Sequence, residues 1–254
     1  GNSMINAGIL QPADIKEGIF PGGNFVYKTT ARDYATSPAM LRVVAKDLKL
    51  GLKKHGDDLF YTVYLDDPNT QTHTRRTRFA GGILVDDVQG KEYVPALLEK
   101  NKDVKEWDEK VTDVNLLYKS YLKYHQTDLQ SVDAGVLHFP YTDGFISALI
   151  FTYKLYPQLI AYGRANIQDK NESPVVISTC SIKDSMCTHY VPLVQAKSFR
   201  LGQDAYTQEE LKPDSLSTIA EVSYTNVMKG FKRALGFSSK KKKNDATTTT
   251  TATE

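Results

Sequence analysis

Five histidines are the first residues to test for chemistry, because imidazole is the commonest protein ligand for metals and a frequent general base. None stands in the HxH or HxxxH spacing of a metal site, and no carboxylate lies beside one at a metal-ligand spacing. We therefore predict surface histidines or hydrogen-bonded core histidines, with no metal and no cofactor. They are His55, His73, His125, His138 and His189.

The two cysteines, Cys180 and Cys187, lack the sequence motif of an activated nucleophile. They lie in PVVISTCSIKDSMCTHYVPL, residues 174–193, which reads as a hairpin with its turn near Lys183 and Asp184. Such a hairpin places Cys180 opposite Cys187. The pair is either two cross-strand thiols in a reducing compartment or a disulfide in an oxidising one. The small number of cysteines favours the reducing compartment. No catalytic residue is predicted, and we expect the chain not to be an enzyme.

Charge offers little further chemistry. Lys and Arg number 32 against 30 for Asp and Glu, a net charge of +2, which provides no global field to attract nucleic acid or acidic lipid. We therefore expect no nucleic-acid partner. In THTRRTR, residues 72–78, Arg76 and Arg78 share one pleat face with Thr74. This arrangement is either an anion site or a solvated hairpin edge, and the second is the commoner.

The most apolar passage is HFPYTDGFISALIFTYKLYP, residues 138–157. A membrane span needs about 20 uninterrupted apolar residues, and Lys154 and Pro157 interrupt this one. We predict instead a core helix that is capped by Asp143, bends at Pro157 and ends near Gly163. The residues predicted to face the core are Ile146, Leu149, Ile150 and Tyr153.

The segments around that helix complete a unit of strand, helix and hairpin. AGVLHFPY, residues 134–141, reads as a strand before the helix, and the hairpin of residues 174–193 follows it.

The first third of the chain repeats the order. Residues 24–35 read as a strand, and Ser37 with Pro38 begins a helix as N-cap and first residue. Leu59 to Pro68 and Thr72 to Val85 form the hairpin, with Leu59, Tyr61, Val63 and Leu65 on one side of the pleat. The apolar face of the helix is Leu41, Val44, Ala45, Leu48 and Leu52, and Gly56 ends it.

Two such units can bury their helix faces against each other. The predicted fold class is therefore α+β, with duplicated β-α-β-β units in pseudo-twofold symmetry, an antiparallel sheet with two packed helices, and a helical connector in which Trp107 docks on the core. The predicted divisions are an N-terminal extension 1–24, a domain 25–200 (repeat one 25–85, connector 91–126, repeat two 134–193), an amphipathic segment 201–237 and a disordered tail 238–254.

Three stretches of the sequence carry a family resemblance: YTVYLDDPNTQTHTRRTRFAGGIL, HFPYTDGFISALIFTYKLYPQLIAYGRAN and the hairpin ending THYVPL. With the duplicated order of elements, they resemble the GyrI-like domain, a small-molecule-binding fold, over about residues 25–194. More narrowly they look like its eukaryotic branch, which includes the testis-expressed ER-phagy receptor.

The resemblance to that branch implies a non-catalytic adaptor on the cytosolic face of the endoplasmic reticulum, or in the cytoplasm, that binds autophagy ubiquitin-like modifiers. The branch carries an N-terminal transmembrane helix and a modifier-binding motif in its tail. Here no spanning helix is found, so any anchor lies outside this chain, and the tail SSKKKKNDATTTTTATE has no aromatic residue. Tyr224 and Val227 form the one exposed-looking motif candidate, and a chance match is the commoner explanation.

The alternative is a soluble GyrI-like binder of a lipophilic or heme-like molecule, with or without weak hydrolase activity. The other lineage of the fold binds lipophilic cations between aromatic walls and a buried glutamate. That glutamate stands four residues before the final proline, where this chain has Thr188, which puts cation capture and hydrolysis in doubt. The cleft candidates, for which packing is the competing role, are Tyr27, Tyr61, Tyr64, Tyr141 and Thr188.

The C-terminal stretch TNVMKGFKRALGF is amphipathic, with basic residues on one side and after it. It either adsorbs to an anionic membrane surface, at about 1 kcal/mol per basic residue, or folds back on the domain with a solvated tail. The basic residues concerned are Lys229, Lys232, Arg233, Lys240, Lys241, Lys242 and Lys243.

Overall fold

The computed structural model describes residues 8, 10–31, 33–50, 59–67, 77–103, 123–142 and 145–205. The chain divides into two compact parts, Gly1–Lys212 and Pro213–Glu254. Every described residue belongs to the first part, and 'unit' below means one of the two β-α-β-β repeats within it. Most of the predicted connector, with Trp107, lies outside the described residues. So do the predicted tail 238–254 and the amphipathic segment 201–237 beyond residue 205.

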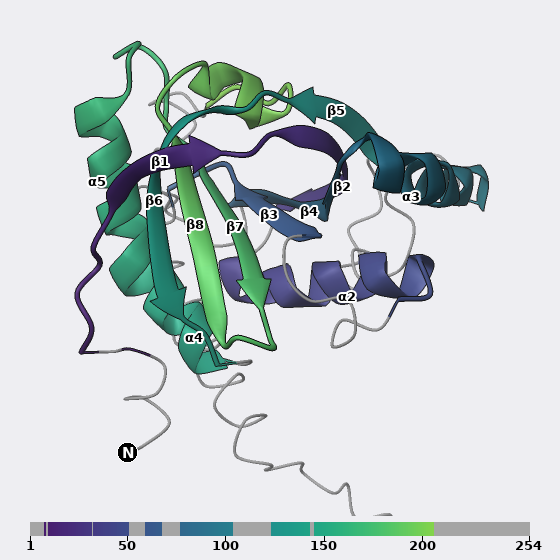
Figure 1. The fold of residues 1–254 in the computed structure, drawn as a ribbon, viewed down its shortest axis with the longest axis horizontal. Helices are drawn as coiled ribbons and strands as arrows, with labels where there is room; N and C mark the ends of the chain where they lie inside the picture. Colours follow the sequence, from purple (N-terminus) through teal and green to yellow (C-terminus); the bar gives the residue numbers. More distant parts are fainter. Residues whose placement is uncertain are drawn as a thin grey trace, which may run out of the picture. The chain divides into compact units, whose positions relative to one another are not determined.

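Eight strands of the described part form one antiparallel sheet in the order β1-β6-β8-β7-β3-β4-β2-β5. Figure 1 shows the sheet strongly curled, with helices packed against it. Alternation of side chains along each strand gives the sheet two different faces. The strands are β1 Lys16–Phe20, β2 Gly23–Ala31, β3 Phe60–Tyr64, β4 Arg78–Val85, β5 His125–Leu129, β6 Val132–Pro140, β7 Val176–Ser181 and β8 Met186–Pro192.

The predicted duplication is confirmed by this strand order. The first unit contributes β3, β4 and β2 outward from the centre, and the second contributes β7, β8 and β6 in the mirrored sequence. The two units meet in the β3–β7 ladder, where Tyr61 pairs with Thr179 and Val63 pairs with Ile177. A half-turn about the centre of this ladder places the strands β3, β4 and β2 on β7, β8 and β6. The sheet therefore has a pseudo-twofold axis. The fold is α+β, as predicted.

Each unit is preceded by a strand that the sequence analysis missed. β1 lay in the predicted extension 1–24, and β5 begins at the end of the predicted helical connector. β1 pairs with β6, and β5 pairs with β2, so each strand joins the opposite unit. Both are short edge strands with mostly exposed side chains, which is why they lack the apolar alternation that identifies a strand.

Helix α2, Ser37–Asp47, packs on β4 and β3 (Figure 1). Thr36 is its N-cap residue and Pro38 lies in its first turn, so the helix starts one residue before the predicted position. Ser37 Oγ lies 3.0 Å from the Tyr64 hydroxyl instead of capping the helix. Val44 and Ala45 are buried and Leu41 and Leu48 pack beside them, as predicted. Leu52 and Gly56 lie outside the described residues.

The second predicted helix is divided into α4, Phe145–Ile150, a π-helical turn, Phe151–Leu155, and α5, Tyr156–Asn166. Pro157 has no N–H and its ring crowds the preceding turn, and the Tyr156 N–H bonds the carbonyl of Phe151, five residues back. The extra residue in this turn rotates the buried face.

The predicted core face of this helix is therefore partly wrong. Ile150 is buried and Ile146 packs on the core, but Leu149 is 36% exposed and Tyr153 is 67% exposed. The π turn buries a different set: Phe151, Leu155, Tyr156, Leu159 and Ile160. The predicted cap, Asp143, lies outside the described residues.

Helix α3, Asp87–Glu99, forms the beginning of the connector, followed by a 3₁₀ turn at Lys100–Asp103. The Asp86 carboxylate accepts hydrogen bonds from the backbone N–H groups of Val88 and Gln89, which caps the helix.

The core lies on both faces of the sheet. On the face that packs on α2, α4 and α5, here called the helix face, two clusters include Val44, Ile83, Leu137 and Tyr156. On the other face, here called the opposite face, a third cluster includes Phe20, Tyr61, Ile177 and Phe199. The opposite face is where side chains from both units meet away from the long helices.

Candidate functional site

Seven residues form one cross-strand row on the opposite face. Each is the direct partner of the next on the neighbouring strand, so their side chains leave the same side of the sheet. The row crosses from the first unit to the second at the Tyr61–Thr179 pair. In order across the sheet, the row consists of His125, Tyr27, Gly82, Tyr61, Thr179, Thr188 and His138.

Glycine is required at the Gly82 position of the row. A Cβ atom there would lie 2.1 Å from the carbonyl oxygen of Val26 and 2.7 Å from the Cα atom of Tyr27. Gly82 therefore allows β2 and β4 to approach closely, and it places no side chain between Tyr27 and Tyr61.

The middle of the row is buried and its two ends are exposed. Tyr61 is 3% exposed, and Tyr27 and Thr179 are also buried, whereas His125 and His138 are exposed and Thr188 is partly exposed. Burial raises the pKa of Tyr27, which keeps its phenol protonated at neutral pH. At the exposed end in the second unit, Thr188 Oγ1 lies 3.0 Å from His138 Nδ1.

Aromatic and aliphatic side chains surround the row. Tyr27 stacks on Phe25 with ring centroids 4.9 Å apart, and its centroid lies 5.7 Å from that of His125. Phe20 meets Tyr61 and Tyr190 edge to face, at 6.4 and 5.4 Å. The next row along the strands is apolar apart from Tyr190, and it runs through Val136, Tyr190, Ile177, Val63 and Ala80.

The structure thus brings together three of the five predicted cleft residues: Tyr27, Tyr61 and Thr188. Tyr64 is separate, because it lies three residues after Tyr61 and alternation sends it to the helix face. There it packs against Tyr34 and Phe151, and burial raises its pKa to about 12. Tyr141 follows the end of β6, where its N–H bonds the carbonyl of Ser185, and it is not in the row.

Four residues of the row were missed by sequence reasoning: His125, Gly82, Thr179 and His138. His125 lies on a strand that was not predicted, so its position could not be assigned. Thr179 and His138 could have been found from the register of the hairpin and of the Ala134–Tyr141 strand, once Thr188 was chosen.

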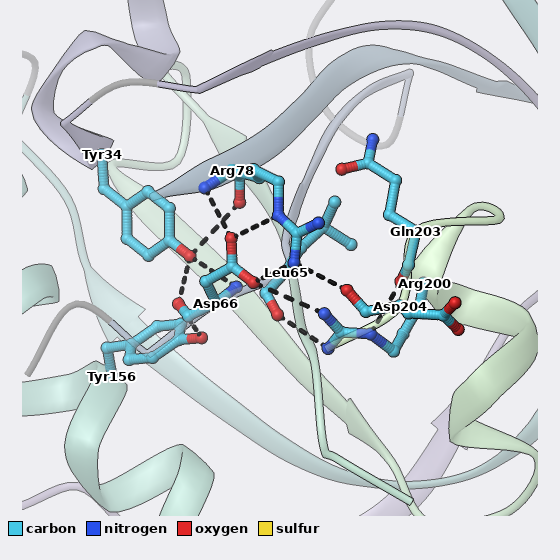
Figure 2. Close-up of polar contacts among 8 residues, drawn as sticks. All are labelled: Tyr34, Leu65, Asp66, Arg78, Tyr156, Arg200, Gln203 and Asp204. Carbon is cyan, nitrogen blue, oxygen red and sulfur yellow. Dashed lines mark hydrogen bonds and ion pairs between the residues drawn. The ribbon is translucent and has the colours of Figure 1, made fainter. Parts of the chain in front are cut away.

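A second polar cluster surrounds the buried carboxylate of Asp66 (Figure 2). Arg78 donates to it from the backbone N–H and from Nε, both 2.8 Å from Oδ2, and from Nη2, 2.7 Å from Oδ1. Arg200 Nη2 lies 3.4 Å from Oδ1, and its Nη1 donates to the Leu65 carbonyl at 2.8 Å. The Asp66 carbonyl accepts from the hydroxyls of Tyr34 and Tyr156, the second at 2.7 Å.

The Asp66 cluster acts as a structural clamp. Tyr34, Asp66 and Arg78 belong to the first unit, Tyr156 belongs to the second, and Arg200 ends the 3₁₀ helix η6, Ala196–Arg200. Because both carboxylate oxygens accept hydrogen bonds from arginine, Asp66 is not available as a general base. The predicted alternative of an anion site at Arg78 is corrected, because its guanidinium is occupied by Asp66. Thr74 and Arg76 lie outside the described residues.

His189 forms a hydroxyl–imidazole pair with Ser178 on the helix face, with Nδ1 2.6 Å from Oγ. Such a pair resembles an activated nucleophile, but both side chains are buried and the Phe151 ring stacks on the imidazole at 5.1 Å. Burial lowers the pKa of His189 to about 3. His189 is therefore a neutral core histidine, one of the two roles predicted for the histidines, and His55 and His73 lie outside the described residues.

Cys180 and Cys187 are cross-strand partners, as the hairpin predicted, and their sulfur atoms are bonded at 1.92 Å. The turn spans Ile182 to Ser185, two residues longer than predicted. Across the described ranges, no three His, Cys, Asp or Glu side chains gather closely enough to hold a metal ion. No helix in the same ranges has the length and apolar content needed to cross a bilayer.

Known proteins give only distant matches. No family model and no curated protein matches the chain. A chain of the EcmrR–DNA complex matches with a TM-score of 0.40 and 10% identity, covering 75% of this chain and 62% of that one. SAV2435 bound to tetraphenylphosphonium matches with a TM-score of 0.37 and 11% identity, covering 71% and 93%. A hydrolase from Listeria innocua matches with a TM-score of 0.36 and 10% identity, covering 73% and 95%.

This chain therefore spans less than two thirds of the matched EcmrR chain, and at these TM-scores the matches contribute nothing to the chemistry assigned to it. They lend no support to the narrower resemblance to an ER-phagy receptor. One expectation is corrected: the sequence analysis expected no nucleic-acid partner, whereas one of the matched solved structures is an EcmrR–DNA complex. Two sets of predicted binding residues lie outside the described residues: Tyr224 and Val227 for the modifiers, and the basic residues 229–243 for the membrane. Neither the autophagy modifiers nor an anionic membrane is proposed as a partner below.

Proposed function

We propose that this protein is a non-catalytic, GyrI-like binding domain that takes a hydrophobic, ring-containing small molecule on the opposite face of its sheet. The observation that carries the proposal is the cross-strand row from His125 to His138, which continues through the pseudo-twofold ladder from one unit into the other. The proposal follows the soluble-binder alternative of the sequence analysis. It replaces the ER-phagy adaptor.

The row has the composition of a ligand site. Ligand sites in proteins combine apolar and aromatic walls with a few placed polar groups. Here Tyr27, Tyr61 and Phe20 form the buried aromatic wall of the row, and Thr179 and Thr188 supply hydroxyls. Burying about 200 Å² of apolar ligand surface would contribute roughly 5 kcal/mol before the entropic cost of association. A micromolar to millimolar ligand is the expected range.

A binding role fits the row better than a catalytic one. Thr188 and His138 form its single described hydroxyl–imidazole contact, at 3.0 Å. A working nucleophile of this type needs a third group that orients the base, and among the described residues no carboxylate bonds His138. A hydrolase is therefore not proposed. A cytoplasmic location stays a prediction.

The test is equilibrium binding to three aromatic probes of different charge: triphenylphosphine oxide, tetraphenylborate and tetraphenylphosphonium. At least one should bind saturably with one site per chain by calorimetry. It should also stabilise the protein, by about 2.7 kcal/mol at one hundred times its dissociation constant.

Two bulky variants locate the site. Thr188→Trp adds an indole at a partly exposed position of the row and should weaken binding at least tenfold. Tyr153→Trp, the matched control, makes a similar change at an exposed position of the π-helical turn and should leave binding unchanged. Binding of none of the three probes at millimolar concentration, or equal binding by Thr188→Trp and wild type, would refute the proposal.

A further inference from the structure

We infer that the ligand of the cross-strand row is an uncharged or anionic aromatic compound and that lipophilic cations are rejected. This inference rests on the proposed function and assigns its ligand class. The deciding property is the balance of charge on the opposite face of the sheet.

No strand of the described part places a carboxylate on this face. Three acidic residues lie within the strands: Glu17 on β1, Asp128 on β5 and Asp133 on β6. On the same three strands, the cluster of the opposite face contains Phe20, Leu129 and Ala134, respectively. Each acidic residue is separated from the cluster residue of its own strand by an odd number of positions, so the two side chains lie on different faces. Alternation therefore turns all three acidic side chains to the other side.

Two acidic residues that flank strands of this sheet, Asp14 and Asp66, are already paired. Asp14, just before β1, makes an exposed ion pair with Lys16 at 3.2 Å. Asp66, just after β3, is shared by Arg78 and Arg200. Neither carboxylate is available to neutralise a bound cation.

The polar groups of the row itself are hydroxyls and imidazoles. At the second-unit end, Thr188 Oγ1 meets His138 Nδ1, and at the other end His125 lies beside Tyr27. Hydroxyl and imidazole N–H groups donate hydrogen bonds to oxygen atoms or anions. They offer no formal negative charge that would compensate a cation for the loss of its hydration.

Aromatic faces alone provide weak compensation for a cation. A cation over a tyrosine ring gains about 0.5–2 kcal/mol, and one face of Tyr27 is already occupied by stacking on Phe25. An unpaired buried charge costs more than this contribution. We therefore expect an anionic or uncharged aromatic compound to bind more tightly than a cation of the same shape.

Tetraphenylborate and tetraphenylphosphonium test this directly, because they have nearly the same shape and opposite charge. Wild-type protein should bind tetraphenylborate at least tenfold more tightly than tetraphenylphosphonium, with triphenylphosphine oxide also bound. Thr188→Glu places a carboxylate in the row and should reverse the preference between the two ions. Thr188→Gln, which has nearly the shape of Glu without the charge, should keep the preference for tetraphenylborate.

The outcomes separate the two proposals. If wild type binds tetraphenylphosphonium as tightly as tetraphenylborate, the charge inference is wrong and the binding function stands. The same conclusion follows if Thr188→Gln and Thr188→Glu change the preference equally. If none of the three probes binds, the proposed function itself fails.

Discussion

Arg78 holds the carboxylate of Asp66 through two side-chain hydrogen bonds, from Nε to Oδ2 at 2.8 Å and from Nη2 to Oδ1 at 2.7 Å. This bidentate contact, with Arg200 on the same carboxylate, ties β3, β4 and the 3₁₀ helix η6 together (Figure 2). The contact is buried, which determines what its loss should cost.

Asp66→Asn should lower the free energy of unfolding by about 3–5 kcal/mol, because it leaves two guanidinium groups without their carboxylate in a buried site. Urea unfolding followed by circular dichroism at neutral pH would measure the loss. The control is Glu99→Gln, which removes an exposed pair with Lys102 at 3.4 Å and should change stability by less than about 0.5 kcal/mol. Equal effects of the two changes would contradict the clamp.

Gly163→Ala and Gly90→Ala should have opposite effects, although both glycines are helical. A Cβ atom on Gly163 would lie 2.7 Å from Val191 Cγ1 and 2.8 Å from Pro174 Cβ, so alanine should force α5 from the sheet at a cost of about 1–3 kcal/mol. On Gly90 the nearest atom would be Val85 Cγ2 at 3.6 Å. Alanine there should stabilise α3 by about 0.5–1 kcal/mol. Thermal unfolding of both variants would show the contrast, and two shifts of the same sign would refute it.

The buried imidazole of His189 should make stability fall on mild acidification. Its folded pKa is lowered to about 3 by burial, below the unfolded value of about 6.5. The stabilisation is therefore present above pH about 6.5 and is lost progressively as pH falls toward 3. Between pH 7 and 5 this single group should remove about 2 kcal/mol.

His189→Asn tests this pH dependence, because asparagine preserves a polar atom near Ser178 and does not titrate. Urea unfolding of wild type and variant would be compared at pH 7 and pH 5. The variant is expected to start less stable and to lose less on acidification. A variant that loses as much stability as wild type between these pH values would show that another group is responsible.

Lys28 is a buried lysine that the fold should tolerate losing. Its ammonium lies 3.7 Å from Asp47 and 4.3 Å from the centre of the Tyr124 ring. Burial lowers its pKa more than Asp47 raises it, so the charged form is disfavoured in the folded state. Lys28→Met removes the cost of burying the ammonium but leaves Asp47 with the Tyr124 hydroxyl as its partner. The free energy of unfolding should therefore change by less than about 1 kcal/mol, with the methionine sulfur packing on Tyr124.

Asp47→Asn is the matched change at this site and should destabilise the protein, because it leaves the Lys28 ammonium unpaired and weakens the bond from the Tyr124 hydroxyl, 2.7 Å from Asp47. Urea unfolding of both variants decides the point. Loss of stability in Lys28→Met as large as that in Asp47→Asn would show that the ion pair stabilises the fold.

Much of the fold could be predicted because each unit has apolar patterns that are visible within a short stretch of sequence. The apolar alternation of Tyr61, Val63 and Leu65, and the helical spacing of Leu41, Val44 and Leu48, are visible in the sequence and are confirmed. Cys180 and Cys187 could be placed opposite each other because a hairpin pairs residues that are near in sequence. Leu59 was predicted on the same side of the pleat as these residues, which is wrong: it precedes β3 and packs on the helix face.

The candidate site was predicted less well, because it depends on register between distant strands. Tyr27, Tyr61 and Thr188 were chosen one by one, the first two as tyrosines and the third as the position where the family has a glutamate. Their common row depends on two pairings between strands that are far apart in sequence, β2 with β4 and β3 with β7. Placing Tyr64 with Tyr61 overlooked a rule that the sequence does contain, the alternation of faces along a strand.

The two repeated units and the hairpin that pairs the cysteines could be read from the sequence alone, because both depend on short-range periodicity. The folded protein was needed to show which strands of the two units are neighbours, how β1 and β5 cross to the opposite unit, and which side chains share a face. It also gathered Asp66, Arg78 and Arg200 into one cluster across 134 positions of the chain. These arrangements arise from long-range strand pairing and burial of charge. Neither can be predicted from local patterns in a single sequence.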